Sequence, residues 1–136
     1  MNQLILKRFR RAWFIGIGGS GMSGLAEVML ASGFEVAGSD LVGSEVTDRL
    51  EKLGATVHIG HKASWVKNVD VVIYSSAVRG ENVELQAAIE QNIPNIPRAE
   101  LLAELMRMKT GIAISGSHGK TTVTSLVGEI ITAGNL

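Results

Sequence analysis

A glycine-rich loop near the start of the chain restricts the fold more than any other feature. The apolar run from Ala12 to Ile17 leads into the loop, and apolar residues at helical spacing follow it as far as Ala31. The loop fits the pattern G-x-G-x-x-G, which binds pyrophosphate groups when it joins a strand to a helix. Its free N–H groups and the positive end of the helix dipole would face the anion. The residues assigned to this anion site are Gly16, Gly18, Gly19, Ser20, Gly21 and Met22.

The three motif glycines have separate expected roles. Gly16 should permit the tight turn, and Gly18 should let the backbone approach a pyrophosphate closely. Gly21 should allow the helix to pack closely against the strand. The motif therefore predicts nucleotide binding rather than a structural turn alone.

Strands and helices alternate along the rest of the chain. This order predicts an α/β fold, a Rossmann-like, doubly wound and mostly parallel sheet with ligands at the carboxyl ends of its strands. We expect residues 1–109 to form this domain and residues 110–136 to begin a second, truncated one. The expected strands are residues 12–17, 34–38, 56–59, 69–74, 95–96 and 111–115, and the expected helices are residues 22–31, 46–53, 83–91, 98–108 and 120–133.

Polar residues follow several of the expected strands. Asp40 comes about 20 residues after the loop, where an acidic residue accepts a ribose hydroxyl, and Ser39 precedes it. The segment Ser75-Ser76-Ala77 follows a buried strand, so its hydroxyls could reach phosphate or ribose. A dinucleotide such as NAD and a UDP-sugar both contain a pyrophosphate and a ribose, so these residues leave the nucleotide open.

A second glycine loop resembles a P-loop. It follows the apolar strand Ile112 to Ser115, although the first glycine of the full pattern is replaced by Ile114. Lys120 would bridge terminal phosphates, and the Thr121 hydroxyl would face Mg²⁺. The alternative is a helix start capped by a hydroxyl side chain. The ATP-binding residues expected here are Gly116, Ser117, His118, Gly119, Lys120, Thr121 and Thr122.

Composition excludes several other classes of function. Lys plus Arg and Asp plus Glu both number 13, so no net charge attracts a nucleic acid. The chain has no cysteine, which excludes disulfides, thiolate metal sites and cysteine nucleophiles. No apolar run reaches the roughly 20 residues of a membrane span. We therefore expect a soluble, cytoplasmic protein that does not bind membranes.

The two loops together, with several short motifs, identify a resemblance to the Mur ligase family. It covers nearly the whole chain after Arg11 and is strongest to the branch that adds L-alanine to UDP-N-acetylmuramate. The Met-Ser after the first loop and the Ser-His within the second are unexpected in a dehydrogenase. The motifs are Gly16 to Gly24, Gly38-Ser39-Asp40, Ser75-Ser76-Ala77, Arg98-Ala99-Glu100 and Gly116 to Thr122.

The resemblance implies an N-terminal part of a three-domain ligase of peptidoglycan synthesis. UDP-N-acetylmuramate would bind the first domain, with His61 at the uracil, and ATP with Mg²⁺ would bind the central domain, with Thr121 at the metal. ATP would phosphorylate the muramyl carboxylate, and L-alanine held by a further domain would attack the acyl phosphate. Catalytic residues within this chain would be Lys120, Thr121 and His118, although His118 could equally only shape its loop.

Further expectations concern the chain on its own. It should lack ligase activity, since most catalytic residues of such an enzyme would lie beyond Leu136, and it should not use NAD. An uncovered strand edge near its end could lead to self-association. Three alternatives stay open: a ligase that attaches recycled peptide to the same sugar nucleotide, an NAD-binding oxidoreductase or sensor, and a stand-alone P-loop module.

Overall fold

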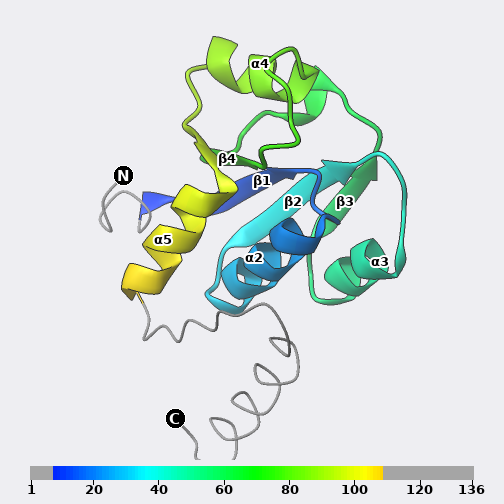
Figure 1. The fold of residues 1–136 in the computed structure, drawn as a ribbon, viewed down its shortest axis with the longest axis vertical. Coiled ribbons are helices and arrows are strands. Elements are labelled where there is room, and N and C mark those ends of the chain that lie inside the picture. Colours follow the sequence, from blue (N-terminus) through cyan, green and yellow to red (C-terminus); the bar gives the residue numbers. More distant parts are fainter. Residues whose placement is uncertain (1–7, 109–136) are drawn as a thin grey trace, which may run out of the picture.

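The computed structural model describes residues 8–108 of the chain (Figure 1). The expected second domain, residues 110–136, and its P-loop therefore lie outside the described residues. The described part contains five strands: β1 (Arg11–Ile15), β2 (Glu35–Asp40), β3 (Thr56–Ile59), β4 (Val71–Tyr74) and β5 (Asn95–Pro97). Its helices are α2 (Ser20–Ala31), α3 (Glu45–Lys52), the 3-10 helix η1 (Ala63–Trp65), α4 (Val83–Glu90) and α5 (Arg98–Met108).

The five strands form one sheet in the order β3-β2-β1-β4-β5. Every adjacent pair is parallel, so the expected mostly parallel α/β sheet is confirmed. Two connections, through α2 and α3, lead from β1 outward to β3, and the chain then returns across the sheet to β4. The direction of winding thus reverses between β1 and β4, which is where open α/β sheets bind ligands.

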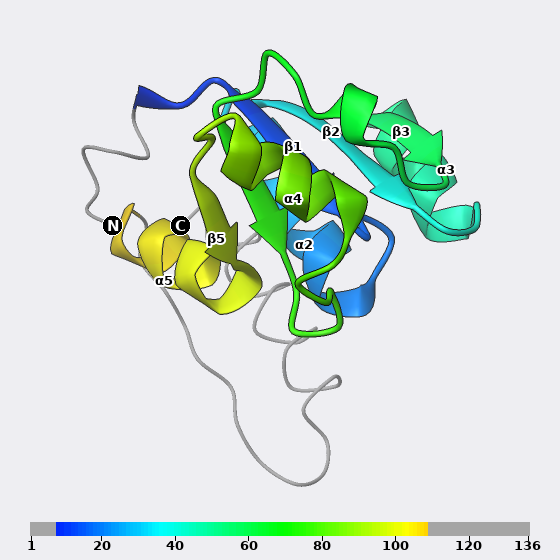
Figure 2. The ribbon, with the colours of Figure 1, turned by 90° about the horizontal axis from the view of Figure 1, so that it is seen from above.

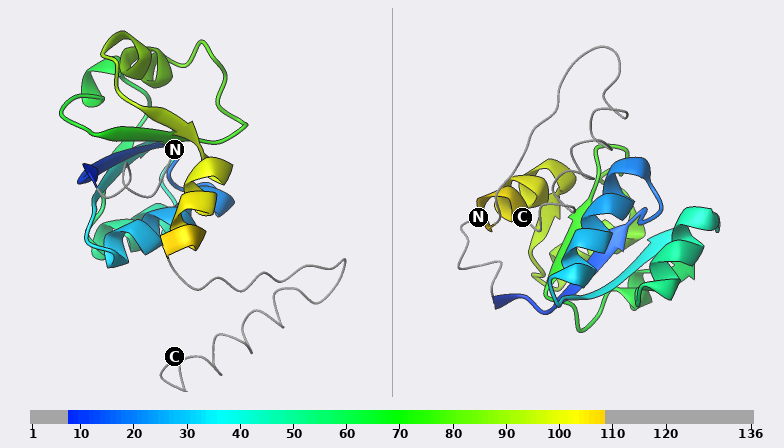
Figure 3. Two further views of the ribbon diagram at one scale, coloured as in Figure 1. Left: turned by 90° about the vertical axis from the view of Figure 1, so that its left-hand side faces the viewer. Right: turned by 90° about the horizontal axis from the view of Figure 1, so that it is seen from below.

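Helices cover both faces of the sheet. Helices α2, α3 and α5 lie on one face, and α4 lies on the other with η1 (Figures 1 and 3). Figure 2 looks onto α4, with strands of the sheet behind it. Among the described residues no helix is long and apolar enough to cross a membrane.

Strand β1 contributes to the core on both faces. Ala12 and Phe14 pack with α2, α3 and α5, whereas Trp13 and Ile15 pack with α4 and η1. All four residues are at most 2% exposed. This is the continuous apolar pattern expected of a central parallel strand.

Side chains define where two of the helices begin. At α3, Ser44 and Thr47 form a reciprocal capping box. At α4, the Asn82 side chain accepts hydrogen bonds from the N–H groups of Glu84 and Leu85. Helix η1 was not expected, because three residues of 3-10 helix leave no periodic apolar pattern.

The amino ends of β1 and β4 are joined by a carboxylate. The N–H groups of Arg10 and Arg11 both donate to Asp70 Oδ2, at 2.8 and 2.9 Å. The backbone hydrogen bonds from Arg10 and Arg11 favour the charged form and lower the pKa of Asp70 below its ordinary value of 3.8. The nearby Arg11 and Arg10 side chains act in the same direction.

Asp70→Asn is therefore expected to lower the free energy of unfolding at pH 7. A carboxyl whose pKa is lower when folded stabilises the protein above its unfolded pKa and loses this effect as the pH falls through the folded pKa. The difference in the free energy of unfolding between wild type and variant should be largest above about pH 5. It should shrink as the pH falls below 3.8. Urea denaturation over a pH series measures this difference, and a difference independent of pH would contradict the assignment.

Candidate nucleotide-binding site

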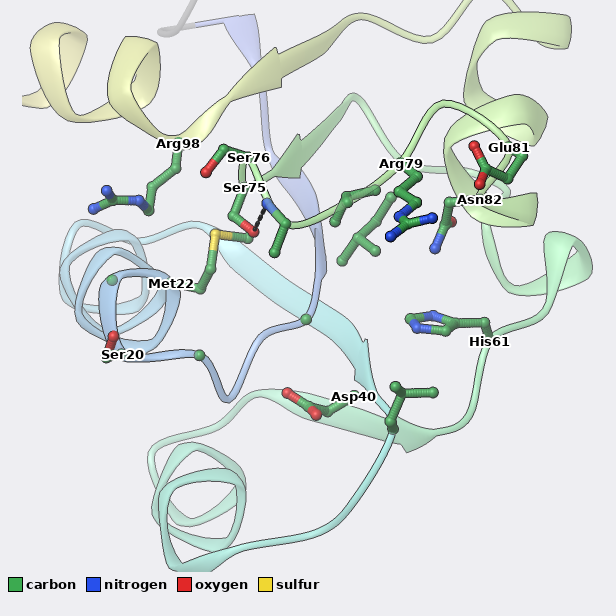
Figure 4. A pocket seen from close by; sticks show the side chains of 17 residues that line it. Ser20, Met22, Asp40, His61, Ser75, Ser76, Arg79, Glu81, Asn82 and Arg98 are labelled. Atoms are coloured by element: carbon green, nitrogen blue, oxygen red, sulfur yellow. Dashed lines mark hydrogen bonds between the residues drawn. The ribbon is translucent and has the colours of Figure 1, made fainter.

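A cavity of about 780 Å³ lies at the carboxyl edge of the sheet. It is bounded by the segments that follow β1, β2, β3 and β4 and by the start of α5. In Figure 4 Ser20 and Arg98 lie at one end, His61 and Asn82 at the other, and Asp40 between them. The cavity therefore coincides with the expected binding edge.

The glycine loop is fixed by backbone hydrogen bonds. Gly16 has a φ of +78°, a conformation that glycine adopts without strain. The N–H groups of Gly16 and Ile17 both donate to the Ser39 carbonyl, at 2.8 and 2.9 Å. The loop is thus attached to the end of β2 as well as to β1.

The N-terminus of α2 is open toward the cavity. Its N-cap residue is Gly19, which has no side chain to cap the helix, and the first turn contains no acidic residue. The N–H groups of Ser20 and Gly21, at the first two helical positions, have no intrahelical acceptor. Unlike α3 and α4, this helix therefore leaves its positive end available to an anion.

Arg98, the first residue of α5, places its guanidinium group beside this helix start. A Cβ added to Gly21 would lie 2.5 Å from Arg98 Nη1. The glycine thus makes room for the arginine, whereas the sequence suggested close packing of the helix on the strand. Among residues 8–108 no carboxylate forms an ion pair with Arg98. A cation beside the positive end of a helix is favourable when an anion lies between them.

Asp40 supports the loop as well as facing the cavity. Its Oδ2 accepts a hydrogen bond from Gly18 N at 2.8 Å, and a Cβ on Gly18 would approach the same oxygen to 2.8 Å. The N–H of Gly18 is thus used inside the protein rather than offered to a ligand. The second carboxylate oxygen, Oδ1, has no hydrogen-bond partner among residues 8–108 and can accept from a ribose hydroxyl.

A buried polar network lies behind the His61 end of the cavity. Glu84 and Ser39 are both 0% exposed. Ser39 Oγ donates to Glu84 Oε1 at 2.7 Å, and Trp13 Nε1 donates to the same oxygen at 2.6 Å. His61 Nδ1 is hydrogen-bonded to Glu84 Oε2 and lies 3.2 Å from Ser39 Oγ. Strands β1 and β2 and helix α4 therefore jointly hold the His61 ring.

Ten of the twelve residues expected to bind a UDP-sugar line the cavity. Gly18 and Ser39 do not line it; the Gly18 N–H holds Asp40, and the Ser39 carbonyl holds the glycine loop. The seven P-loop residues, Gly116, Ser117, His118, Gly119, Lys120, Thr121 and Thr122, lie outside the described residues. The ten are Gly16, Gly19, Ser20, Gly21, Met22, Asp40, His61, Ser75, Ser76 and Ala77.

Sequence reasoning assigned no site role to several other residues of the wall. Leu41, directly after β2, is 69% exposed. Arg79 is a second cationic side chain in the wall, besides Arg98. The position of Leu41 and Arg79 after strand ends is a signal that could have identified them. The wall residues not expected are Ile15, Leu41, Val78, Arg79, Glu81, Asn82 and Arg98.

Comparison with known families identifies the class of protein. The family model described as Mur ligase family, catalytic domain, matches residues 12–110. The chain therefore belongs to the Mur ligase family, as the motifs indicated.

Individual relatives lie in the alanine-adding branch. The UDP-N-acetylmuramate–L-alanine ligase of Desulfatibacillum aliphaticivorans is 58% identical over 123 residues, which cover 90% of this chain and 27% of that protein. The crystal structure of the corresponding ligase of Thermotoga maritima has a TM-score of 0.83 at 32% identity, over 90% of this chain and 29% of that one.

A murein peptide ligase has the same fold at lower identity. The murein peptide ligase of Psychrobacter arcticus has a TM-score of 0.83 at 25% identity, over 93% of this chain and 27% of that one. These identities favour the alanine-adding branch over the other ligase. The family match does not favour an NAD-binding oxidoreductase or a stand-alone P-loop module. The chain spans little more than a quarter of the length of the relatives it matches.

Proposed function

We propose that the described domain binds UDP-N-acetylmuramate. The observation that carries this proposal is the uncapped N-terminus of α2 with Arg98 beside it, at the edge of a cavity that also contains Asp40 and His61. The pyrophosphate would accept hydrogen bonds from Ser20 N and Gly21 N and pair with Arg98. The ribose would donate to Asp40 Oδ1, and the base would lie at His61.

The remaining wall has room for the sugar. The loop after β4 presents the Ser75 and Ser76 hydroxyl groups beside the glycine loop (Figure 4). Ser75 Oγ accepts from Ala77 N at 3.3 Å, so its own hydrogen stays available to a ligand oxygen.

The parent reaction is proposed from family membership. The full-length protein would join L-alanine to UDP-N-acetylmuramate, using ATP and Mg²⁺, in the cytoplasm. In that assignment Gly116 to Thr122 hold ATP, and Thr121 faces Mg²⁺. The boundary between the first and the central domain falls between residues 109 and 110. This domain supplies the sugar-nucleotide site.

Isothermal titration calorimetry of the chain with UDP-N-acetylmuramate, UDP, uridine and NADH tests the proposal. We expect saturable binding of both diphosphates and much weaker binding of uridine, because uridine lacks the pyrophosphate that the helix start and Arg98 recognise. NADH should bind more weakly than either diphosphate. Binding of NADH as tight as that of UDP-N-acetylmuramate would refute the assignment in favour of a dinucleotide site.

A further inference from the structure

A carboxylate that no ligand could touch directly lies behind the cavity wall. Glu84 is wholly buried in the first turn of α4, yet it hydrogen-bonds to Trp13, Ser39 and His61. Buried charged groups contribute little net stability compared with well-packed apolar side chains. Fold stability alone therefore gives a weak reason for a glutamate at this position.

The hydrogen-bond donors around Glu84 determine which ring nitrogen of His61 carries the proton. An indole nitrogen only donates, so Glu84 Oε1 accepts from Trp13. The Ser39 hydroxyl also donates to Glu84 Oε1, so its oxygen presents lone pairs to His61 Nδ1 at 3.2 Å. Both atoms that face Nδ1, Glu84 Oε2 and Ser39 Oγ, are then acceptors. We assign the ring proton to Nδ1.

The other ring nitrogen is left for the cavity. A neutral imidazole carries one N–H and one lone pair, so with the proton on Nδ1 the lone pair belongs to Nε2. The His61 side chain is 24% exposed, and its ring extends into the cavity in Figure 4. Nε2 is therefore a hydrogen-bond acceptor at the end of the cavity farthest from the α2 N-terminus.

We propose that Glu84 is a positioning residue that fixes His61 as an acceptor for the N3–H group of uracil. This inference rests on the proposed binding of a uridine nucleotide. Going along the cavity, the phosphate end at Ser20 and Arg98, the carboxylate of Asp40 and the ring of His61 follow the order phosphate, ribose and base (Figure 4). Uracil carries one N–H donor between two carbonyl groups. An acceptor held in a single tautomer recognises that donor, whereas a donor at the same position would oppose it.

Glu84→Gln replaces the hydrogen-bond acceptor that faces His61 with a hydrogen-bond donor. The amide oxygen can keep accepting from Trp13 and Ser39, while the amide NH₂ takes the place of Oε2 and donates to His61 Nδ1. The ring proton should then move to Nε2. ¹⁵N NMR at pH 8 distinguishes the two tautomers, and His61→Ala identifies the signals among the three histidines of the chain.

We expect the spectra to show the Nδ1–H tautomer of His61 in the wild type and the Nε2–H tautomer in Glu84→Gln. A role of Glu84 in packing alone would lower stability without exchanging the tautomer. Nε2–H in the wild type would overturn the inference, and that measurement stands even if the variant does not fold.

Calorimetry with UDP at pH 8 tests the consequence for binding. Glu84→Gln and His61→Ala should each weaken UDP binding about tenfold, by loss of one hydrogen bond. The double variant should bind no more weakly than His61→Ala, because Glu84 acts through His61. Glu90→Gln, which removes an exposed carboxylate from the same helix, should leave the affinity unchanged.

Two outcomes separate this inference from the proposed function. Additive losses in the double variant, or wild-type affinity in Glu84→Gln, would overturn the role of Glu84 while UDP binding itself stands. If the wild type fails to bind UDP, the proposed function fails, and the tautomer measurement still decides whether Glu84 sets the proton on His61.

Discussion

Replacing Gly38 by alanine should destabilise the chain by about 3 kcal/mol or more, the range of severe overpacking in a core. Gly38 lies in β2 opposite Phe14 of β1. A Cβ at this position would lie 2.4 Å from the Phe14 carbonyl oxygen and 2.9 Å from Ile17 Cβ. The nearest atom belongs to the backbone of the central strand, which cannot move aside as a flexible side chain could. Urea denaturation measures the loss.

Gly24→Ala is the matched control for Gly38→Ala. Gly24 lies within α2, and a Cβ there would meet no atom within 4 Å. Alanine favours the helix over glycine by roughly 1 kcal/mol, so this variant should be more stable than the wild type. Equal effects of the two substitutions would show that the contact with Phe14 does not limit position 38.

Arg98→Met is expected to weaken binding of UDP by about 10- to 100-fold, the equivalent of a lost hydrogen bond to a charged group. Methionine retains an unbranched apolar side chain beside Gly21 but removes the cation at the start of α2. The loss should shrink as the salt concentration rises, because salt screens the attraction between a guanidinium group and a diphosphate. Calorimetry at low and high salt measures both effects.

Two further substitutions show whether the loss is specific to this position. Arg98→Lys keeps the charge without the planar donor pair and should bind with intermediate affinity. Arg49→Ala removes a cation that pairs with Glu27 at 2.9 Å on an exposed surface, and it should leave the affinity unchanged. If Arg98→Met bound UDP like the wild type, the pyrophosphate would have to lie elsewhere in the cavity.

The order of elements was predictable because each signal for it is local. The glycine loop, the apolar run of β4 and the helical spacing in α5 each lie within about a dozen neighbouring residues. The bounds of α5 were predicted as Arg98–Met108 and are confirmed. At α2 the expected start at Met22 was two residues late, because Ser20 and Gly21 belong to the glycine motif and show no apolar period.

Part of the site depends on contacts between distant segments, which no local pattern reports. Trp13 and Glu84 are 71 positions apart, and Glu84 is one of two glutamates in α4, whose sequence contains no recognisable motif. Arg98 was noted only within a family motif, since its proximity to Gly21 depends on α5 returning to the face that carries α2. Asp40, His61 and Ser75 could be found from the sequence because they lie at or just after the carboxyl ends of β2, β3 and β4. Their binding roles stay predictions.

The central position of β1 in the sheet lowers the free-energy cost of ordering the protein when a ligand binds. Its amide groups pair with strands on both sides and its side chains are buried on both faces, so exchange with solvent there should require global unfolding. The glycine loop continues directly from this strand, and hydrogen bonds to Ser39 fix its first turn. The backbone that we propose to bind the pyrophosphate is thus ordered before any ligand arrives. A nucleotide that binds there loses little free energy to ordering the protein, so more of its interaction energy contributes to affinity.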